Sequence, residues 1–292
     1  MNIVYKEKIN KGWSTDIKYL IKDDNNNKYL LRISSIDQYD KKLIEFDYLK
    51  KLEKIGLSMC KPIEFGTCDE GVYIILSWVE GVDAQEYILN LSNKEQYEYG
   101  IIAGKELLKI HSLKAPSNIF DWEEKFNKKI DRKIKMYEDC PIKIDKANNL
   151  IEYINNNRHL LKNGNLVFHH GDYHIGNMMI NENKELVIID FNRADFGDPY
   201  EEFNRIVWCA QASSYFASGM VDGYFNNDIP IDFWKVLALY ISSNTLSSIP
   251  WAIPFGKEEI EVMINQSKDV LRWYDDMNTY IPSWYKKINQ SS

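Results

Sequence analysis

The stretch HHGDYHIGN at residues 169–177, followed by IIDF at residues 188–191, decides the fold of this chain. Asn177 follows Asp172 by five residues, and Asp190 follows Asn177 by thirteen. This spacing can place one carboxylate beside a substrate hydroxyl, and an amide with a second carboxylate on a metal ion. Short strand-like runs surround the two stretches, so Asp172 and Asn177 are expected in a loop and Asp190 at the end of a hairpin.

Outward from these stretches, the chain changes from a strand pattern to a helical pattern. Strand-like runs alternate with turn residues before residue 80, and one helix with apolar residues at three-residue spacing ends at Gly56. The sequence therefore predicts an α+β fold with a small β-rich lobe at 1–80 and a larger, mainly helical lobe at 81–292. The expected strands are 17–21, 28–33, 63–66, 72–76, 167–169, 178–180 and 186–189, and the expected helices are 41–55, 96–111, 122–137, 146–158, 201–217, 232–246 and 258–274.

The motif H-G-D-x-H-x-x-N, followed by I-D-F, resembles the aminoglycoside phosphotransferase and choline kinase superfamily, whose fold is like that of protein kinases. The resemblance implies two lobes, ATP or another nucleoside triphosphate, and Mg²⁺. It implies that Asp172 orients the attacking hydroxyl as the catalytic residue. Asn177 and Asp190 would hold the metal ion against the phosphates.

Two other interpretations of this stretch remain open. Asp172 and Asn177 can be turn residues and Asp190 a strand-end cap. His169, His170 and His174 can form a metal cluster with Asp172, although adjacent residues on a strand point to opposite faces and no distal His or Cys group completes the set. In the kinase interpretation, His170 is expected to brace the loop through hydrogen bonds.

The superfamily resemblance also assigns nucleotide-binding residues in the first 80 positions. Ser14 lies in the loop 10–16, which has a single Gly and would cover the phosphates. Arg32 occupies the position of the usual strand Lys, and Glu45 on the following helix is its expected ion-pair partner. Arg keeps the cation but is bulkier and forked, so this position departs from the pattern. A plain turn and a surface salt bridge are the alternatives.

The segment Ser77-Trp78-Val79 follows an apolar strand and fits the hinge between two lobes. Its backbone groups would bind the edge of the adenine ring. Two further segments resemble scaffold parts of the superfamily. His111 ends a helix in the first, at 107–112. In the second, at 198–203, Asp198 is expected to cap a helix that has Pro199 at its first position. No superfamily motif is recognisable beyond about residue 210.

The composition excludes several classes of protein. The net charge of −7 argues against a sequence-independent nucleic-acid binder, which needs a basic face. No apolar run reaches the length of a membrane span, and residues 1–12 lack the apolar core of a secretory signal. The four cysteines have no metal-finger spacing and are expected to be free thiols. We expect a cytoplasmic monomer that binds neither nucleic acid nor membrane.

The segment after Asp190 indicates a small-molecule acceptor. Only eleven residues separate Asp190 from Glu202, too few for the activation segment that docks a peptide on a protein kinase. Residues 190–292 carry fourteen acidic and eight basic side chains, a net charge of −6. Such a field would attract a cationic acceptor, which favours an aminoglycoside kinase of the antibiotic-resistance type; an ordinary acidic surface is the alternative.

Other acceptors also remain possible. Five tryptophans in this region can bind a quaternary ammonium through cation–π contacts, as in a choline-type kinase, although aromatic residues at helical spacing usually form core. The stretch 247–254 is expected to be a loop that could line a pocket for a bulky apolar acceptor such as a macrolide. The departure at Arg32 leaves open a nucleotide-binding module without catalysis. The tryptophans are Trp208, Trp234, Trp251, Trp273 and Trp284.

Overall fold

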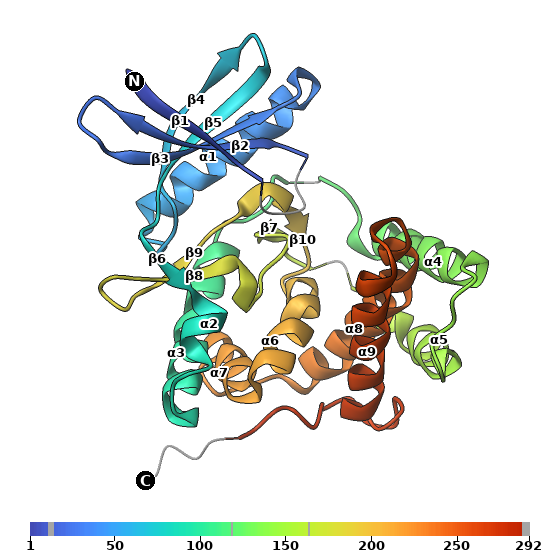
Figure 1. Ribbon diagram of the computed structural model, residues 1–292. Helices are drawn as coiled ribbons and strands as arrows, with labels where there is room; N and C mark the ends of the chain where they lie inside the picture. The colour runs from blue at the N-terminus through green and yellow to red at the C-terminus, as the bar shows by residue number, and fades with distance from the viewer. Residues whose placement is uncertain (11–14, 118, 163, 288–292) are drawn as a thin grey trace. The chain divides into compact units, whose positions relative to one another are not determined.

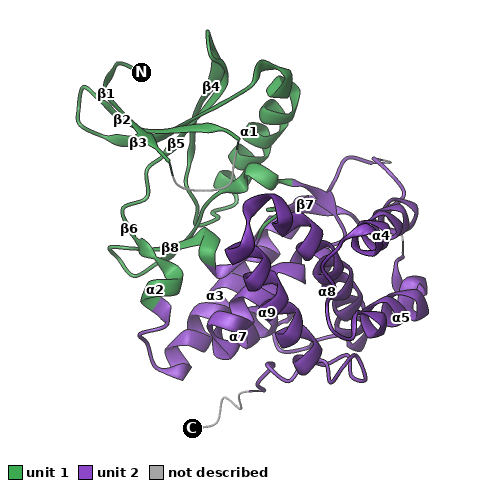
Figure 2. Cartoon of the chain, turned by 45° about the vertical axis from the view of Figure 1, so that its right-hand side comes forward, with its two compact units in different colours: residues 1–87, 170–172, 176–194 green, residues 88–169, 173–175, 195–292 purple. Residues whose placement is uncertain are grey.

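The computed structural model describes residues 1–10, 15–117, 119–162 and 164–287. The chain forms two compact units, coloured green and purple in Figure 2. Each unit combines several stretches of the chain, so the units are not two consecutive lobes. The predicted boundary at residue 80 stays a prediction. Unit 1 comprises Met1–Tyr87, His170–Asp172 and Gly176–Ala194, and unit 2 comprises Ile88–His169, Tyr173–Ile175 and Asp195–Ser292.

An antiparallel five-stranded sheet forms most of unit 1 (Figure 1). Its buried side chains Ile21, Leu31, Ile33 and Ile75 form one core cluster, as expected for alternating strands with one covered face. Helix α1 (Tyr39–Lys54) packs against β4 and β5. The strand order is β1 (Ile3–Ile9), β2 (Ile17–Asp23), β3 (Lys28–Ser34), β5 (Gly71–Ser77), β4 (Pro62–Cys68).

Local chemistry explains why two of these elements end where they do. The Asp23 carboxylate accepts hydrogen bonds from the backbone N–H groups of Asn25 and Asn27, and Asn26 adopts a left-handed φ of +64°, which closes the β2–β3 hairpin. Helix α1 ends at Lys54, and Gly56 follows with a left-handed φ of +74°. The N–H groups of Gly56 and Leu57 bond back into the last turn of the helix.

A second, three-stranded sheet brings the segment after residue 176 into unit 1. Strand β8 (Met178–Asn181) pairs with β6 (Gly81–Asp83) on one side and with β9 (Leu186–Ile188) on the other. The N–H of Ile188 donates to the carbonyl of Ser58 at 2.8 Å, which joins β9 to the segment that precedes β4. The short helix α2 (Ala84–Ile88) follows β6.

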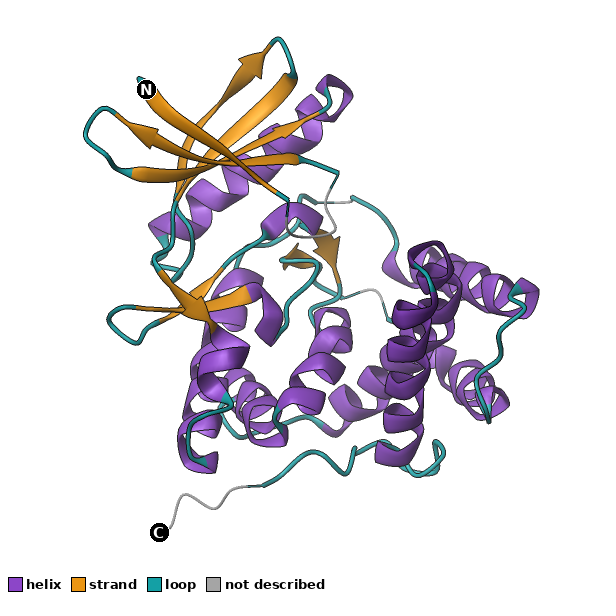
Figure 3. Ribbon diagram, viewed as in Figure 1, coloured by secondary structure: helices purple, strands orange, loops and turns teal. Residues whose placement is uncertain are grey.

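Unit 2 is mainly helical (Figure 3). Its β-structure is a two-stranded ladder of β7 (Val167–His169) and β10 (Asp195–Gly197) among the described residues. Its helices are α3 (Asn93–His111), α4 (Trp122–Asp139), α5 (Ala147–Asn157), α6 (Ile206–Ala212), α7 (Ser214–Phe225), α8 (Ile231–Ala252) and α9 (Lys257–Trp273). One-turn 3₁₀ segments lie at 36–38, 158–160, 175–177, 191–193, 201–205 and 253–255.

Glycines allow helices α3 and α7 to pack closely. Gly100 and Gly104 on α3 are spaced four residues apart, as are Gly219 and Gly223 on α7. A Cβ atom on Gly104 would collide with the carbonyl oxygen of Met220, so only the absence of a side chain permits this approach. Backbone-to-backbone contact thus joins two helices that are far apart in sequence.

The predicted α+β fold class is confirmed, with three local corrections. The helix expected at 201–217 is wrong as a single element, because Ser213 has an extended backbone and its side chain caps a new helix, α7. The stretch 247–254 is helical through Ala252 rather than a loop, even though Pro250 lies in the last turn of α8. Asp198 does not cap a helix with Pro199 at its first position; its carboxylate accepts from Tyr200 N–H in a turn.

Among the described residues, no helix combines the length and the apolar character that a membrane span requires.

Candidate active site

The loop after β7 is held by His170, which is completely buried. The imidazole Nε2 lies 2.8 Å from the carbonyl oxygen of Ile189 and donates to it, while Nδ1 accepts from the N–H of Asp172 at 3.2 Å. The ring also contacts Phe191, with 4.5 Å between ring centroids. The hydrogen bonds expected of His170 as a brace for the loop are therefore present.

Backbone and side-chain hydrogen bonds bring the three residues of the motif together in unit 1. The amide nitrogen of Asn177 donates to the carbonyl of Asp172 at 2.9 Å. The N–H of Ile189 donates to the carbonyl of Asn177 at 3.1 Å, which places Asp190 one residue from that contact. Asp190 itself has a left-handed φ of +67°, rare for a residue with a side chain and a frequent sign of a functional position.

Two further residues shape the environment of Asp172. Gly171 has a φ of +84°, and a Cβ atom there would collide with the carbonyl oxygen of Arg193, so the loop requires glycine. The Arg193 guanidinium lies 3.6 Å from Oδ2 of Asp172. Sequence reasoning did not single out Arg193, and only the folded loop places it beside the carboxylate.

Arg32 lies at the centre of a buried ion cluster. Its guanidinium is 2.5 Å from Asp16 Oδ2, 3.8 Å from Glu45 Oε1 and 3.6 Å from Asp190 Oδ1. The ion pair expected between Arg32 and Glu45 is thus present, and it is buried rather than on the surface. Its Nε is also buried and has no hydrogen-bond partner among the described residues, so one donor is available to a further anion.

Lys42 and Asp16 complete this cluster, and sequence reasoning missed both. Lys42 Nζ lies 3.2 Å from Asp16 and 3.0 Å from Glu45. Burial by itself raises the pKa of Asp16, but the charges of Arg32 and Lys42 and a hydrogen bond from Ser34 outweigh it and lower that pKa to about 2. One signal was visible in the sequence: Lys42 and Glu45 occupy the apolar stripe of α1, where a charged residue needs a partner.

The donor atoms around Asp190 fit a hard divalent cation. Asn177 supplies an amide oxygen and Asp190 a carboxylate whose side chain is 32 % exposed, and Mg²⁺ prefers such oxygen ligands. Among the described residues, the ion pairs of this cluster join three carboxylates (Asp16, Glu45 and Asp190) to two cations, Arg32 and Lys42. A cation bound at Asp190 would balance the third negative charge.

Two backbone N–H groups of the segment 77–79, the predicted hinge, make hydrogen bonds within the protein. The N–H of Ser77 donates to the carbonyl of Lys61 at 2.8 Å, and the N–H of Trp78 donates to the carbonyl of Lys28 at 3.3 Å. Among the described residues, no hydrogen bond is made by the N–H of Val79. Ser14 lies outside the described residues, so its predicted role stays a prediction.

The alternative metal cluster of His169, His170, His174 and Asp172 does not form. Within the part of the chain that the structure describes, one group of His, Cys, Asp and Glu has metal-binding spacing, and it contains His169 but none of the other three. The His174 ring instead faces Trp208, with 6.3 Å between centroids.

Comparisons with known proteins identify the family and the fold of the chain. The model of the APH family, described as "Phosphotransferase enzyme family", matches residues 7–236. Aminoglycoside phosphotransferase APH(4)-Ia, as an apo thermostable mutant, is similar with TM-score 0.65 and 14% identity over 92% of this chain and 94% of that chain. Amicoumacin kinase hAmiN, in complex with AMP-PNP, Ca²⁺ and Ami, has TM-score 0.67 and 14% identity over 94% and 90%.

A gentamicin complex of APH(2")-IIa has TM-score 0.64 and 18% identity over 91% of each chain. At these identities the solved structures share the fold, and no curated protein matches the sequence. The family model, in contrast, covers well over half of the chain. The chain therefore belongs to the APH phosphotransferase enzyme family.

Proposed function

We propose that this protein is an ATP-dependent small-molecule kinase that transfers the γ-phosphoryl group to a hydroxyl of a cationic, aminoglycoside-like acceptor, as an antibiotic-resistance enzyme does. The observation that carries the proposal is the placement of Asp172, Asn177 and Asp190 by one set of hydrogen bonds, with Arg32 on Asp190. Positioning and charge compensation are what phosphoryl transfer requires of a protein.

Each residue then has a defined task. Asp172 accepts the proton of the acceptor hydroxyl and orients its oxygen for in-line attack, while Arg193 pairs with the carboxylate and limits its rotation. Asn177 and Asp190 hold Mg²⁺, which when bound neutralises charge on the phosphates. Through its hydrogen bond to Ile189, His170 fixes the position of Asp190 relative to Asp172.

The nucleotide is bound by the cations of unit 1 and by the hinge. Arg32 takes the role of the usual strand Lys, with its unpartnered Nε available to a phosphate oxygen and Glu45 as its carboxylate partner. Lys42 supplies the second positive charge of the cluster. The N–H of Val79 binds the adenine edge, so the identity of the side chains at Ser77 and Trp78 matters little.

The structure weakens the argument that the negative charge of residues 190–292 attracts a cationic acceptor. Many acidic side chains of residues 190–292 already have internal partners: Asp222 bonds the hydroxyls of Tyr97 and Tyr285 at 2.7 Å, and Glu201 pairs with Lys129 at 2.9 Å. Others remain at the surface. The acidic surface available to an acceptor is therefore smaller than the net charge of −6 suggests.

One exposed region of unit 2 still combines negative charge with aromatic rings. Trp251 and Phe255 are 38% and 46% exposed, with 4.8 Å between ring centroids. The first two turns of α9, which follow them directly, carry Glu258, Glu259 and Glu261, of which Glu261 pairs with Lys257 at 3.7 Å. Carboxylates beside aromatic faces suit an amine-bearing acceptor, which supports a cationic ligand.

A choline-type kinase and a macrolide kinase receive less support. Three of the five tryptophans, Trp234, Trp273 and Trp284, are buried core residues with exposures of 7% or less, so they offer no cation–π surface. The stretch 247–254, expected to be a pocket-lining loop, is mostly helix. A nucleotide-binding module without catalysis is disfavoured because the chain retains Asp172, Asn177 and Asp190 together, with the hydrogen bonds described above.

The test is turnover with a panel of acceptors. Purified protein, ATP and Mg²⁺ are incubated with gentamicin, hygromycin B, spectinomycin, amicoumacin, choline and a macrolide, and ADP release and phosphorylation of the acceptor are followed. We expect phosphorylation of an amine-bearing antibiotic that is absent in Asp172→Asn. Phosphorylation of choline alone would support the metabolite kinase, and nucleotide binding without any transfer would support the non-catalytic module.

A further inference from the structure

Three buried side chains of unit 2 form a second cluster of potential metal ligands. His111 ends α3, His169 ends β7, and Glu202 lies in the 3₁₀ segment Glu201–Arg205; they are 3%, 1% and 2% exposed. One donor atom from each lies within 4.8 Å of the other two, and the imidazole centroids are 5.5 Å apart. None of these three residues belongs to the predicted Mg²⁺ site of Asn177 and Asp190.

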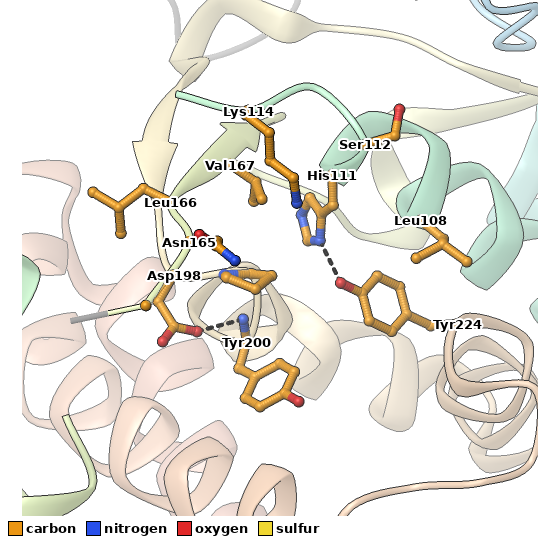
Figure 4. A pocket seen from close by; sticks show the side chains of 12 residues that line it. Leu108, His111, Ser112, Lys114, Asn165, Leu166, Val167, Asp198, Tyr200 and Tyr224 are labelled. Atoms are coloured by element: carbon orange, nitrogen blue, oxygen red, sulfur yellow. Dashed lines mark hydrogen bonds between the residues drawn. The ribbon is translucent and has the colours of Figure 1, made fainter. Parts of the chain in front are cut away.

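Each imidazole is held by its Nδ1 atom. His111 Nδ1 lies 2.8 Å from the hydroxyl of Tyr224, drawn as a dashed line in Figure 4. His169 Nδ1 lies 3.5 Å from Asp195 and 3.9 Å from Glu201. A carboxylate or hydroxyl on one imidazole nitrogen is the usual outer contact of a metal-binding histidine, because it fixes which nitrogen presents its lone pair.

The Nε2 atoms of both imidazoles are buried. Among the described residues, Nε2 of His111 and Nε2 of His169 have no hydrogen-bond partner, and His111 Nε2 lies 3.9 Å from a carboxylate oxygen of Glu202. Buried polar atoms without partners are uncommon, and a bound water molecule or ion is one way to satisfy them. Gly197 makes room for this arrangement, since a Cβ there would approach His169 Cε1 to 2.5 Å.

We propose that His111, His169 and Glu202 bind a transition-metal dication, of which Zn²⁺ is the best match. Two imidazole nitrogens and one carboxylate are an established three-residue ligand set for zinc, and a small exogenous ligand takes the fourth position. Tetrahedral zinc with ligand bonds of about 2.1 Å separates its ligands by about 3.4 Å. The donor atoms here are 3.9 Å apart for His111 and Glu202 and within 4.8 Å of one another overall, so binding requires them to move closer by about 0.5 to 1.4 Å.

A cavity of unit 2 borders the cluster at His111. It encloses about 390 Å³, and His111, Lys114 and Asp198 are among its lining residues (Figure 4). Burial raises the pKa of Asp198 to about 6. Of the three cluster residues, His111 lines this cavity.

The surroundings shift the pKa values of the two imidazoles in opposite directions. Burial lowers the pKa of His111 to about 4. Burial also acts to lower the pKa of His169, but Glu202 and Asp195 outweigh it and raise that pKa to about 9.

A metal ion bound at this site would stabilise the fold of unit 2. It would cross-link the end of α3, the end of β7 and the segment that precedes α6, which are remote in sequence. His169 also directly precedes His170, the residue that braces the loop of Asp172. The expected readouts are metal binding and stability, which do not depend on phosphoryl transfer.

The experiment uses tag-free, metal-stripped protein, because a histidine tag would itself bind zinc. Zn²⁺ is titrated calorimetrically at pH 8 in excess Mg²⁺, which occupies hard-oxygen sites. Wild type is compared with His169→Gln and Glu202→Gln, and with His159→Gln, which removes an exposed imidazole outside the cluster. We expect one zinc ion per chain, at least tenfold weaker binding in the two cluster variants, and no change in the control.

A second measurement decides the question if the cluster variants do not fold. Co²⁺ is added to wild-type protein in the same buffer, and its visible absorption is recorded before and after Zn²⁺ is added. Intense bands of four- or five-coordinate cobalt that zinc abolishes support the site. A spectrum equal to that of hydrated Co²⁺, or zinc binding that is the same in wild type and His169→Gln, overturns the proposal.

Discussion

His170 Nε2 donates a hydrogen bond to the carbonyl oxygen of Ile189 over 2.8 Å, so the residue two places before Asp172 is tied to the residue directly before Asp190. The same imidazole accepts from the N–H of Asp172 at 3.2 Å. One buried side chain thus controls the positions of the proposed base and of a proposed metal ligand.

Replacing His170 is expected to impair catalysis by misplacing these two residues. In His170→Ala, the loss of two hydrogen bonds at about 1 kcal/mol each should lower the free energy of unfolding, and kcat should fall by more than KM changes. Urea unfolding and steady-state kinetics measure both. His170→Gln, which can restore one bond, should recover part of kcat; a kcat in His170→Ala equal to wild type contradicts the positioning role.

Replacing Asp172 tests the base itself. Asp172→Asn keeps the shape of the side chain but removes the proton acceptor, so kcat should fall by about 10²-fold or more while the Kd for ATP stays nearly unchanged. Kinetics and equilibrium nucleotide binding separate the two quantities. Asp228→Asn, an exposed replacement of the same type, serves as the control. An active Asp172→Asn enzyme rules out the assignment.

Replacing Asp190 should change the Mg²⁺ requirement of the enzyme. Asp190→Asn removes the carboxylate that faces Arg32 at 3.6 Å and is proposed to hold Mg²⁺, so both Mg²⁺-ATP affinity and turnover should fall. A titration of activity against Mg²⁺ concentration should shift to higher concentrations by at least tenfold. An unchanged Mg²⁺ requirement would show that this carboxylate is not a ligand.

The cluster around Arg32 predicts a pH effect on stability. Because the folded-state pKa of Asp16 is about 2, below the ordinary 3.8, its ionised form stabilises the folded state at neutral pH by about 2 kcal/mol. This contribution is fully present above about pH 4 and is lost as the pH falls toward 2. The stability difference between wild type and Asp16→Asn should therefore shrink between pH 4 and pH 2, as measured by urea unfolding; a constant difference excludes this linkage.

The close approach of α3 and α7 predicts an unusual response to alanine. Gly104→Ala should favour the isolated helix by about 1 kcal/mol, yet the new Cβ would meet the backbone of Met220 and, at 2.6 Å, of Tyr224. We expect a net loss of at least 1 kcal/mol in the free energy of unfolding. Gly164→Ala, where a Cβ has no neighbour within 4 Å, should be near neutral. Equal stability in the two variants contradicts the packing argument.

Local patterns in the sequence predicted the elements and the motif. Three-residue spacing of apolar residues and the stop at Gly56 place α1 to within two residues at each end, because side-chain periodicity and glycine conformation are local properties. The break at Ser213 and the continuation of α8 past Pro250 were missed. Both depend on tertiary contacts, such as the Ser213 hydroxyl on Gln96, which override local propensity.

The sequence by itself determined the fold class, the family motif and the chemical identity of Asp172, Asn177 and Asp190, because their spacing is a property of the chain. Only the tertiary structure brought Lys42 and Asp16 to Arg32, and His111 and Glu202 to His169. Pairing of buried charges is decided by which elements pack together, and the chain separates these partners by up to 91 residues. Burial then fixes the pKa of each group, since desolvation and the nearest opposite charge exist only in the folded protein.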